Sequence, residues 1–204
     1  MSILDKVVAA VTPTETEEQR LNARVRARSA AMEGDWLSLV LLHHQWIEST
    51  FEAVKAATDA ATRAMAQKRL ALVLTGHAIA EEAVLYPALL NANEEGHSIR
   101  AYREQSEVKV QMSLLEDLPP MSQEYLDKLG HIREAVAHHA YEEEGQWFLE
   151  LRKRLPPADQ VKLTFRYQEE FTRYTQGRGD PESLGLRRVV PEWALDELRG
   201  RGPI

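Results

Sequence analysis

Three histidine–glutamate pairs interrupt the apolar stripes of three long helical patterns, and this feature constrains the fold most. Their spacing, His-x-x-x-Glu, places both side chains of a pair on one face of an α-helix. Each pair stands where hydrophobic residues would otherwise continue the stripe, so each is expected to face the interior of a helical bundle. A buried, unpaired carboxylate costs several kcal/mol unless it binds a cation. The pairs are His44–Glu48, His77–Glu81 and His139–Glu143.

The chain is predicted to be helical almost throughout. Alanine, leucine, glutamate, arginine and glutamine dominate the periodic segments, and glycine or proline marks most of their ends. Four long amphipathic segments with short connections favour an up-down-up-down four-helix bundle, so the predicted fold class is all-α. The expected segments are residues 36–57, 64–90, 97–118 and 122–155.

The chain outside the bundle is predicted to form extensions. Residues 1–34 are expected to be an N-terminal helical extension, with a capping box formed by Thr14–Glu17. The bundle is expected to cover residues 35–156, followed by an additional helix at 157–176. From residue 177 glycine, proline and arginine become frequent and the periodicity fades, so residues 177–204 are expected to be a C-terminal tail.

Composition excludes several functional classes. The 204 residues contain no cysteine, which excludes disulfides, zinc fingers, iron–sulfur clusters and thiol catalysis and favours a cytoplasmic location. The formal net charge of −7 argues against a nucleic-acid partner. No apolar run approaches the roughly 20 residues of a membrane span, so no membrane partner is expected.

The buried pairs predict a metal site. Arginines are missing from the same stripes, so internal salt bridges give no obvious relief to the carboxylates. Imidazole and carboxylate ligands suit iron, manganese or zinc, and bundle interiors are where facing helices build such sites. The alternative is a hydrogen-bonded polar network without metal. The candidate ligands are His44, Glu48, His77, Glu81, His139 and Glu143.

Other polar residues lie beside these candidates. His43 and His138 each precede a candidate ligand by one position, about 100° away around the helix, and are predicted to stand behind the ligands or at the surface. Glu82, Glu142 and Glu144 are predicted to form a solvated face.

Two segments resemble the bacterial hemerythrin-like HHE cation-binding domains. They are His77–Leu89, which contains a Tyr-Pro dipeptide, and His138–Phe148. The resemblance covers about residues 36–155 and implies a bundle that holds an oxygen-bridged pair of iron ions. Carried over to this chain, it implies three histidine ligands and two bridging carboxylates: His44, His77, His139, Glu81 and Glu143.

The third helix departs from the family pattern. The family typically reads Glu-His-x-x-Val-Lys, whereas Glu104–Lys109 reads Glu-Gln-Ser-Glu-Val-Lys. Gln105 therefore stands where the fourth histidine is expected, and Glu48 is the predicted replacement ligand. Tyr102, one turn before Gln105, either faces the metals as a redox or hydrogen-bonding group or fills the bundle as a buried aromatic.

The resemblance implies a function at this centre. The expected cofactor is a pair of iron ions, with manganese or zinc as alternatives, and the expected ligands are O2, peroxide or NO. Such a protein binds or reduces these molecules, as in a diiron oxidase or a peroxide-degrading enzyme, or senses iron and oxygen. The alternative is a metal-stabilised helical scaffold that binds a partner protein. The apolar face of residues 3–11 could pair subunits in a homodimer.

Overall fold

The computed structural model describes residues 15–92 and 95–176. These residues form helices and turns, with no β-strand among them, which confirms the all-α fold class. Thr14, the apolar face of residues 3–11 and the predicted tail lie outside the described residues. The elements are α2 Glu17–Ala30, α3 Trp36–Ala56, α4 Ala60–Ala80, the π-helix η1 Glu81–Leu85, α5 Tyr86–Asn91, α6 Glu95–Glu116, α7 Gln123–Glu142, the π-helix η2 Glu143–Trp147, α8 Phe148–Arg154 and α9 Pro157–Gln176.

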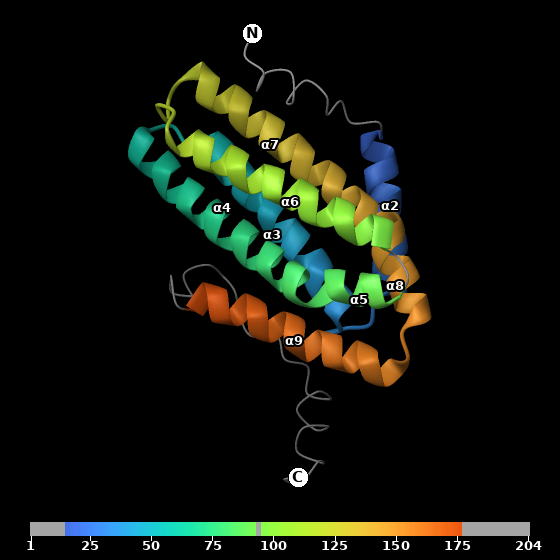
Figure 1. Cartoon of the computed structure of the whole chain (residues 1–204). Helices are drawn as coiled ribbons and strands as arrows, with labels where there is room; N and C mark the ends of the chain where they lie inside the picture. The colour runs from blue at the N-terminus through green and yellow to red at the C-terminus, as the bar shows by residue number, and fades with distance from the viewer. Residues whose placement is uncertain (1–14, 93–94, 177–204) are drawn as a thin grey trace.

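Four of the helices form a closed ring. Helix α3 packs against α4 and α7, and α6 packs against the same two helices (Figure 1). Successive helices are neighbours in this ring and run alongside one another, as expected for a four-helix bundle with short connections. Side chains that point inward from all four helices therefore meet in one interior.

Side-chain caps set where several helices begin. Asp35 accepts a hydrogen bond from the backbone N–H of Ser38 at the start of α3, where aspartate is a favoured N-cap residue. The capping box of the first described helix is formed by Thr16 and Gln19, and α2 begins at Glu17. The predicted box from Thr14 was wrong by two residues, because glutamine at the third helical position closes the box as well as glutamate does.

Two long helices contain a wide π-turn. The expected continuous helices at 64–90 and 122–155 are each interrupted by five residues of π-helix, which begin at Glu81 and at Glu143. Pro87 gives a physical cause for the first interruption, since it has no N–H to continue the α-helical ladder. In its place the N–H of Tyr86 bonds to the carbonyl of Glu81. Such π-turns are often found at functional sites.

Helices α2 and α9 lie outside the ring. Helix α9 packs on α4, α3 and η1, and α2 packs on η2, α3, α7 and α8 (Figure 1). The contact between α4 and α9 is close at Gly76. A Cβ atom at this position would lie 3.1 Å from Thr175 Cγ2 and 3.3 Å from Tyr174 Cδ1. Glycine is therefore what allows α9 to approach the bundle here.

Two apolar clusters fill the bundle on either side of its middle. On α3 and α4 the predicted histidine ligand lies between residues of one cluster and residues of the other, and His139 lies along the chain between Ile132 of the second cluster and Trp147 of the first. Apolar side chains therefore lie on both sides of the histidines. The largest fully buried residues of the first cluster are Trp36, Trp147, Tyr86, Tyr167, Phe148, Leu37, Leu41, Leu85 and Leu89, and those of the second are Phe51, Leu70 and Tyr125.

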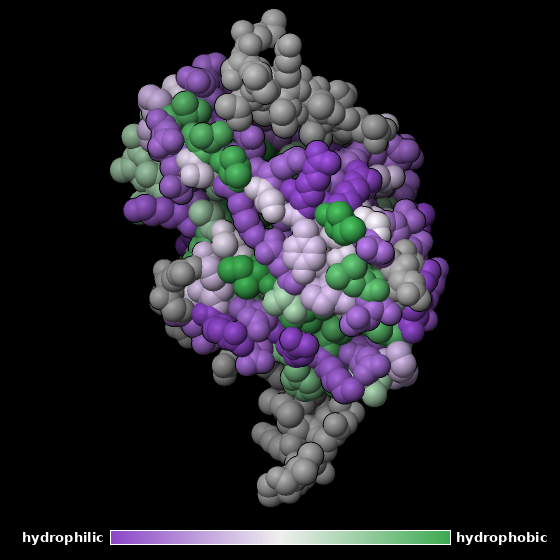
Figure 2. Space-filling model, in the orientation of Figure 1, coloured by the Kyte–Doolittle hydropathy of each residue, from purple (hydrophilic) through white to green (hydrophobic). Residues whose placement is uncertain are grey.

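The surface carries mixed polarity. On the face seen in Figure 2, hydrophobic residues form small separate groups among hydrophilic ones. Scattered exposed apolar residues are normal for a folded protein. Among the described helices, none is both long and apolar enough to cross a lipid bilayer.

The Gly76 contact predicts different changes in the free energy of unfolding for alanine substitutions at Gly130 and at Gly76. Gly130→Ala places a Cβ where no atom lies within 4 Å, so we expect it to stabilise the fold by about 0.5–1 kcal/mol through helix propensity. Gly76→Ala should lose this gain because the new Cβ crowds α9. Urea unfolding of both variants measures the difference. Equal stabilisation by both substitutions would show that α9 is not held closely against α4.

Candidate metal centre

Four buried side chains from three helical segments converge in the middle of the bundle. They are His44, His77, Glu81 and Glu143, and each offers a ligand atom within 4.8 Å of the others. His77 Nε2 lies 3.2 Å from Glu81 Oε2, and His44 Nε2 lies 3.3 Å from Glu143 Oε2. We refer to these residues as the four-residue cluster.

The hydroxyl of Tyr86 lies on the other side of the two carboxylates. It is 3.0 Å from His139 Nε2, 3.0 Å from Glu143 Oε1 and 3.2 Å from Glu81 Oε2. Gln105 Nε2 donates to this hydroxyl at 2.5 Å. Glu143 therefore lies between His44 and His139, and Glu81 Oε2 lies 3.2 Å from both His77 Nε2 and the Tyr86 hydroxyl.

The two carboxylate oxygens of Glu143 face different helices. Oε2 lies 3.3 Å from His44 Nε2 on α3, and Oε1 lies 3.2 Å from His139 Nε2 on α7. Glu143 is fully buried. A carboxylate in this position can bind one cation through each oxygen, as a bridge between two ions requires.

Three buried atoms of the four-residue cluster have no hydrogen-bond partner among the described residues. They are His44 Nε2, Glu81 Oε1 and Glu143 Oε2. Buried polar atoms are normally satisfied, and orphaned ones call for a specific explanation. All three are metal donors, and mixed imidazole and carboxylate ligands suit iron, manganese or zinc. The residues present therefore fit a bound metal cation.

Carboxylates hold the outer nitrogen of two of the histidines. His44 Nδ1 lies 2.8 Å from Glu144 Oε1, and Arg24 on α2 pairs with Glu144 at 3.2 Å. His139 Nδ1 lies 2.8 Å from Glu104 Oε2 on α6. A carboxylate on the outer nitrogen fixes the ring orientation and leaves Nε2 free to bind metal.

A tyrosine holds the outer nitrogen of the third histidine. The Tyr167 hydroxyl on α9 lies 3.0 Å from His77 Nδ1 and 2.9 Å from His43 Nδ1. With Nε2 of His77 turned to the cluster, its Nδ1–H donates to the Tyr167 oxygen, and the Tyr167 O–H donates to His43. The His43 ring also stacks on Phe171 with centroids 3.8 Å apart.

Charges in the cluster shift the pKa values of its members. Burial and the neighbouring Glu143 carboxylate raise the pKa of Glu81 well above its usual value. Burial opposes a charge on His44, but Glu143 and Glu144 outweigh it and raise the pKa of His44 to about 9. Burial, with a smaller effect from His44, lowers the pKa of His43 to about 3, so His43 is neutral.

The comparison with protein families agrees with this geometry. The profile of the hemerythrin HHE cation-binding domain matches residues 37–151, more than half of the chain. The chain belongs to this family. Helices α2 and α9 lie outside the matched residues of the hemerythrin-like domain. Even so, Arg24 on α2 pairs with Glu144, and Tyr167 on α9 contacts His77.

A curated relative matches a shorter part of the chain. It is a protein of Nostoc sp. (strain PCC 7120 / SAG 25.82 / UTEX 2576) described as a DNA nickase, and the two sequences are 35% identical over 82 residues. The match covers 40% of this chain and 23% of the Nostoc protein, so this chain spans only a minor part of that protein's length. No solved structure matches the chain significantly.

Glu48 does not lie where the sequence places it. Its carboxylate accepts a hydrogen bond at 3.0 Å from Nε of Arg133 on α7, and its side chain is 38% exposed. The expected interior position was wrong. A step of four residues also turns about 40° around an α-helix. On the unbroken helix α3, Ile47 and Phe51 take the interior positions after His44.

Of the other predicted residues, one lies beside the four-residue cluster and two lie away from it. Gln105 touches Glu81 beside the four-residue cluster, with Nε2 donating to Oε2 at 2.6 Å. The Tyr102 hydroxyl donates to the backbone carbonyl of Glu82 at 2.6 Å, so this tyrosine packs in the bundle and does not face the cluster. His138 lies toward the surface, where Nδ1 is 2.8 Å from Glu15.

A second group of potential metal ligands lies near the surface, and an arginine side chain lies among them. Glu104, His138 and Glu142 offer ligand atoms close together. Arg100 lies among them, with Nε 2.8 Å from Glu104 and Nη1 2.7 Å from Glu142. The guanidinium supplies the positive charge that these carboxylates need, so we do not assign a metal to this group.

Sequence reasoning missed four residues around the centre. Glu144 was expected on a solvated face, but it is buried and bonds to His44. Tyr86 carries a weak signal, because it lies in the Tyr-Pro dipeptide five residues after Glu81. Glu104 stands at the glutamate of the family pattern Glu-His-x-x-Val-Lys, whereas Tyr167 carries no local signal, since its partners lie on other helices.

The Tyr167 hydroxyl predicts a specific effect on metal affinity. Tyr167→Phe should weaken metal binding about ten- to a hundredfold, because an outer hydrogen bond of this kind holds the ligand ring in place. The ring itself is retained, so the fold should change little. Competition with a chelator measures the affinity. Tyr102→Phe is the matched control, and an equal effect of both substitutions would contradict the assignment.

The raised pKa values predict competition between metal and protons. The pKa values of Glu81, His44 and His139 are all raised, so protons occupy positions that a metal must take. Metal binding should therefore release protons, and the affinity should fall as the pH is lowered from about 8 to 6. Titration with ferrous iron in weak buffer with a pH indicator measures both. Affinity that is independent of pH would contradict this arrangement.

Proposed function

We propose that this chain is a non-heme diiron protein that binds or reacts with O2, peroxide or NO. The observation that carries the proposal is the position of Glu143 between His44 and His139, with one carboxylate oxygen toward each. A single metal needs no such bridge. Two cations that share Glu81 and Glu143 would use every orphaned donor atom of the four-residue cluster.

The proposed ligand set differs from the sequence-based expectation. It contains three histidines and two carboxylates, and it leaves out Glu48, which pairs with Arg133. These ligands leave open positions on two six-coordinate ions, and a site with open positions is suited to binding a small molecule. The ligands in this proposal are His44, His77, His139, Glu81 and Glu143.

The carboxylates at the centre favour cations. Glu104 and Glu144 contact the outer nitrogens of two of the histidines and are themselves paired with Arg100 and Arg24. Glu81 and Glu143 are therefore the carboxylates that oppose the charge of two divalent ions, and the remaining positive charge favours an anionic ligand at the open positions. Iron fits the imidazole and carboxylate donors, and manganese or zinc would compete for them in proportion to their availability.

The residues of the chain would have separate roles at such a centre. Bound iron ions would supply open coordination positions and electrons to a small ligand. The Tyr86 hydroxyl, which lies between His139 and the carboxylates, would hold or move a proton there. The two apolar clusters pack on both sides of the centre, and Tyr167, Glu104 and Glu144 orient the histidines.

Two other functions are less well supported. A metal-stabilised scaffold for a partner protein would need no open positions at its metals, and it predicts no spectral response to peroxide or NO. DNA nicking is named for the Nostoc relative, which this chain matches over 40% of its own length. The net charge of −7 disfavours contact with a phosphate backbone, so we do not propose nicking for this chain.

Metal content tests the proposed ligands. We expect about two iron ions per chain and a near-ultraviolet absorption that azide or peroxide shifts. His77→Ala and His139→Ala should each lose at least one ion, because each removes an imidazole donor. Glu48→Gln is the control and should keep both ions, since Glu48 pairs with Arg133 at the surface. Loss of iron in Glu48→Gln, or full iron in both histidine variants, would overturn the assignment.

A further inference from the structure

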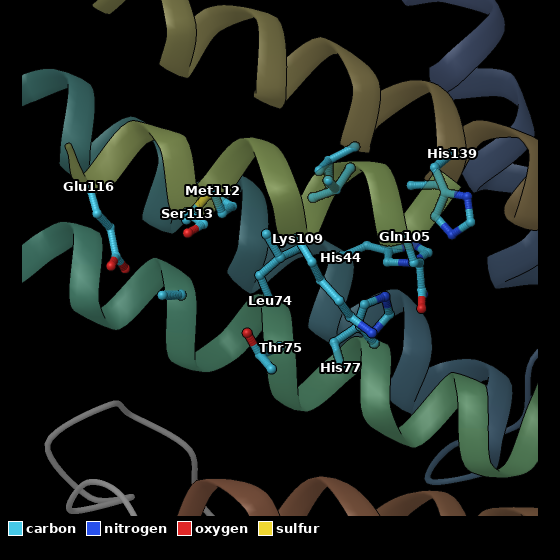
Figure 3. A pocket seen from close by; sticks show the side chains of 15 residues that line it. His44, Leu74, Thr75, His77, Gln105, Lys109, Met112, Ser113, Glu116 and His139 are labelled. Atoms are coloured by element: carbon cyan, nitrogen blue, oxygen red, sulfur yellow. The ribbon is translucent and has the colours of Figure 1, made fainter. Parts of the chain in front are cut away.

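A cavity of 280 Å³ extends from the proposed metal centre between α4, α6 and α7. His77, Gln105 and His139 lie at one end of it, and Glu116 lies at the other (Figure 3). Most of the wall between these ends is apolar. The apolar residues that line it include Ala71, Leu74, Val108, Met112 and Val136.

The cavity is larger than O2, NO or peroxide requires. An engineered apolar cavity of roughly 150 Å³ is enough to hold benzene. The space here, 280 Å³, therefore admits an organic molecule with about ten non-hydrogen atoms. Diatomic ligands would need no apolar wall of this length beside them.

Gln105 carries an unpaired hydrogen-bond acceptor beside the inner end of the cavity. Its Nε2 donates to Glu81 Oε2 at 2.6 Å and to the Tyr86 hydroxyl at 2.5 Å, which fixes the orientation of the amide. The side-chain oxygen Oε1 is buried and has no hydrogen-bond partner among the described residues, although the residue is only 6% exposed. An acceptor of this kind costs free energy unless a donor reaches it.

The polar lining of the cavity does not select a charged ligand. Thr75 and Ser113 contribute hydroxyls, and Lys109 and Glu116 contribute one charge of each sign. The Lys109 ammonium already pairs with Glu82 at 2.5 Å. A neutral ligand therefore fits the cavity better than an ion.

We propose that this cavity binds a neutral organic molecule with an apolar body and a terminal O–H group that donates to Gln105 Oε1. Alcohols and organic hydroperoxides share this chemistry. The inference extends the proposed function, because the O–H end would lie beside the metal centre. Binding itself depends on the cavity and on Gln105, and it can be tested separately from the metals.

Three related probe molecules test the apolar body and the O–H group of the proposed ligand one at a time. Cumyl alcohol has an apolar body and an O–H group, cumene has the body alone, and methanol has the O–H group with almost no body. Ligand-observed NMR on the full chain, both iron-loaded and after treatment with a chelator, measures their affinities. Cumyl alcohol should bind about fivefold tighter than cumene because of one neutral hydrogen bond. Methanol should not bind at the same concentration.

Three variants connect these affinities to the cavity. Ala71→Phe fills it from α4 and should weaken cumyl alcohol and cumene at least tenfold. Ala61→Phe adds the same ring at an exposed position of α4 and should change neither. Gln105→Leu should make the two probes bind equally, because it removes the acceptor. Should Ala71→Phe lose its helical circular dichroism, Val108→Phe fills the cavity from α6 and takes its place.

The outcomes separate this inference from the proposed function. Unchanged binding in the cavity-filling variant, or a preference for cumyl alcohol that persists in Gln105→Leu, would overturn the inference even if two irons are present. Probe binding that follows the predicted pattern, in a chain that fails to take up two iron ions when iron is supplied, would support the cavity and overturn the proposed function. In the iron-loaded chain, a spectral change with cumene hydroperoxide but none with cumyl alcohol would identify the hydroperoxide as the preferred ligand.

Discussion

Burial of Glu81 and Glu143 is the constraint on which the rest of this structure depends. Both carboxylates are 0% exposed, and apolar clusters lie on both sides of them. Two uncompensated charges in such a place would cost a free energy comparable to the whole free energy of unfolding of a small domain. The histidines of three helices face these carboxylates, and the atoms left unpaired are the ones that cations would satisfy. Without a metal, the raised pKa values of Glu81, His44 and His139 place protons where cations would bind.

The groups that hold this centre extend beyond the family domain. Arg24 on α2 pairs with the carboxylate that contacts His44, and Tyr167 on α9 contacts His77. Both helices lie outside the residues that match the hemerythrin HHE profile. Helix α9 can reach the histidines because Gly76 leaves room for close packing on α4. The extensions therefore influence metal binding and stability together, so removal of α9 would expose His77 and change its orientation.

The centre is asymmetric because of Gln105. Two histidines face the carboxylates from one side, whereas His139 is the one histidine on the other side, where Gln105 and Tyr86 complete the contacts. An amide is a poor metal ligand but a good hydrogen-bonding group. Gln105 uses its N–H groups within the centre, and its buried oxygen has no hydrogen-bond partner among the described residues. The residue that departs from the family pattern thus connects the metal centre to the space where an organic ligand fits.

The sequence by itself determined the helical fold and two of the three pairs. Helical periodicity places His77 with Glu81 and His139 with Glu143, because those contacts span one turn of one helix. The same spacing failed for Glu48, whose partner Arg133 lies 85 residues away on α7. Only the tertiary structure decided that Glu143 reaches His44, that Glu144 is buried and that Tyr167 joins the centre. These contacts depend on which helices pack together, and the spacing of residues along one helix carries no information about its neighbours.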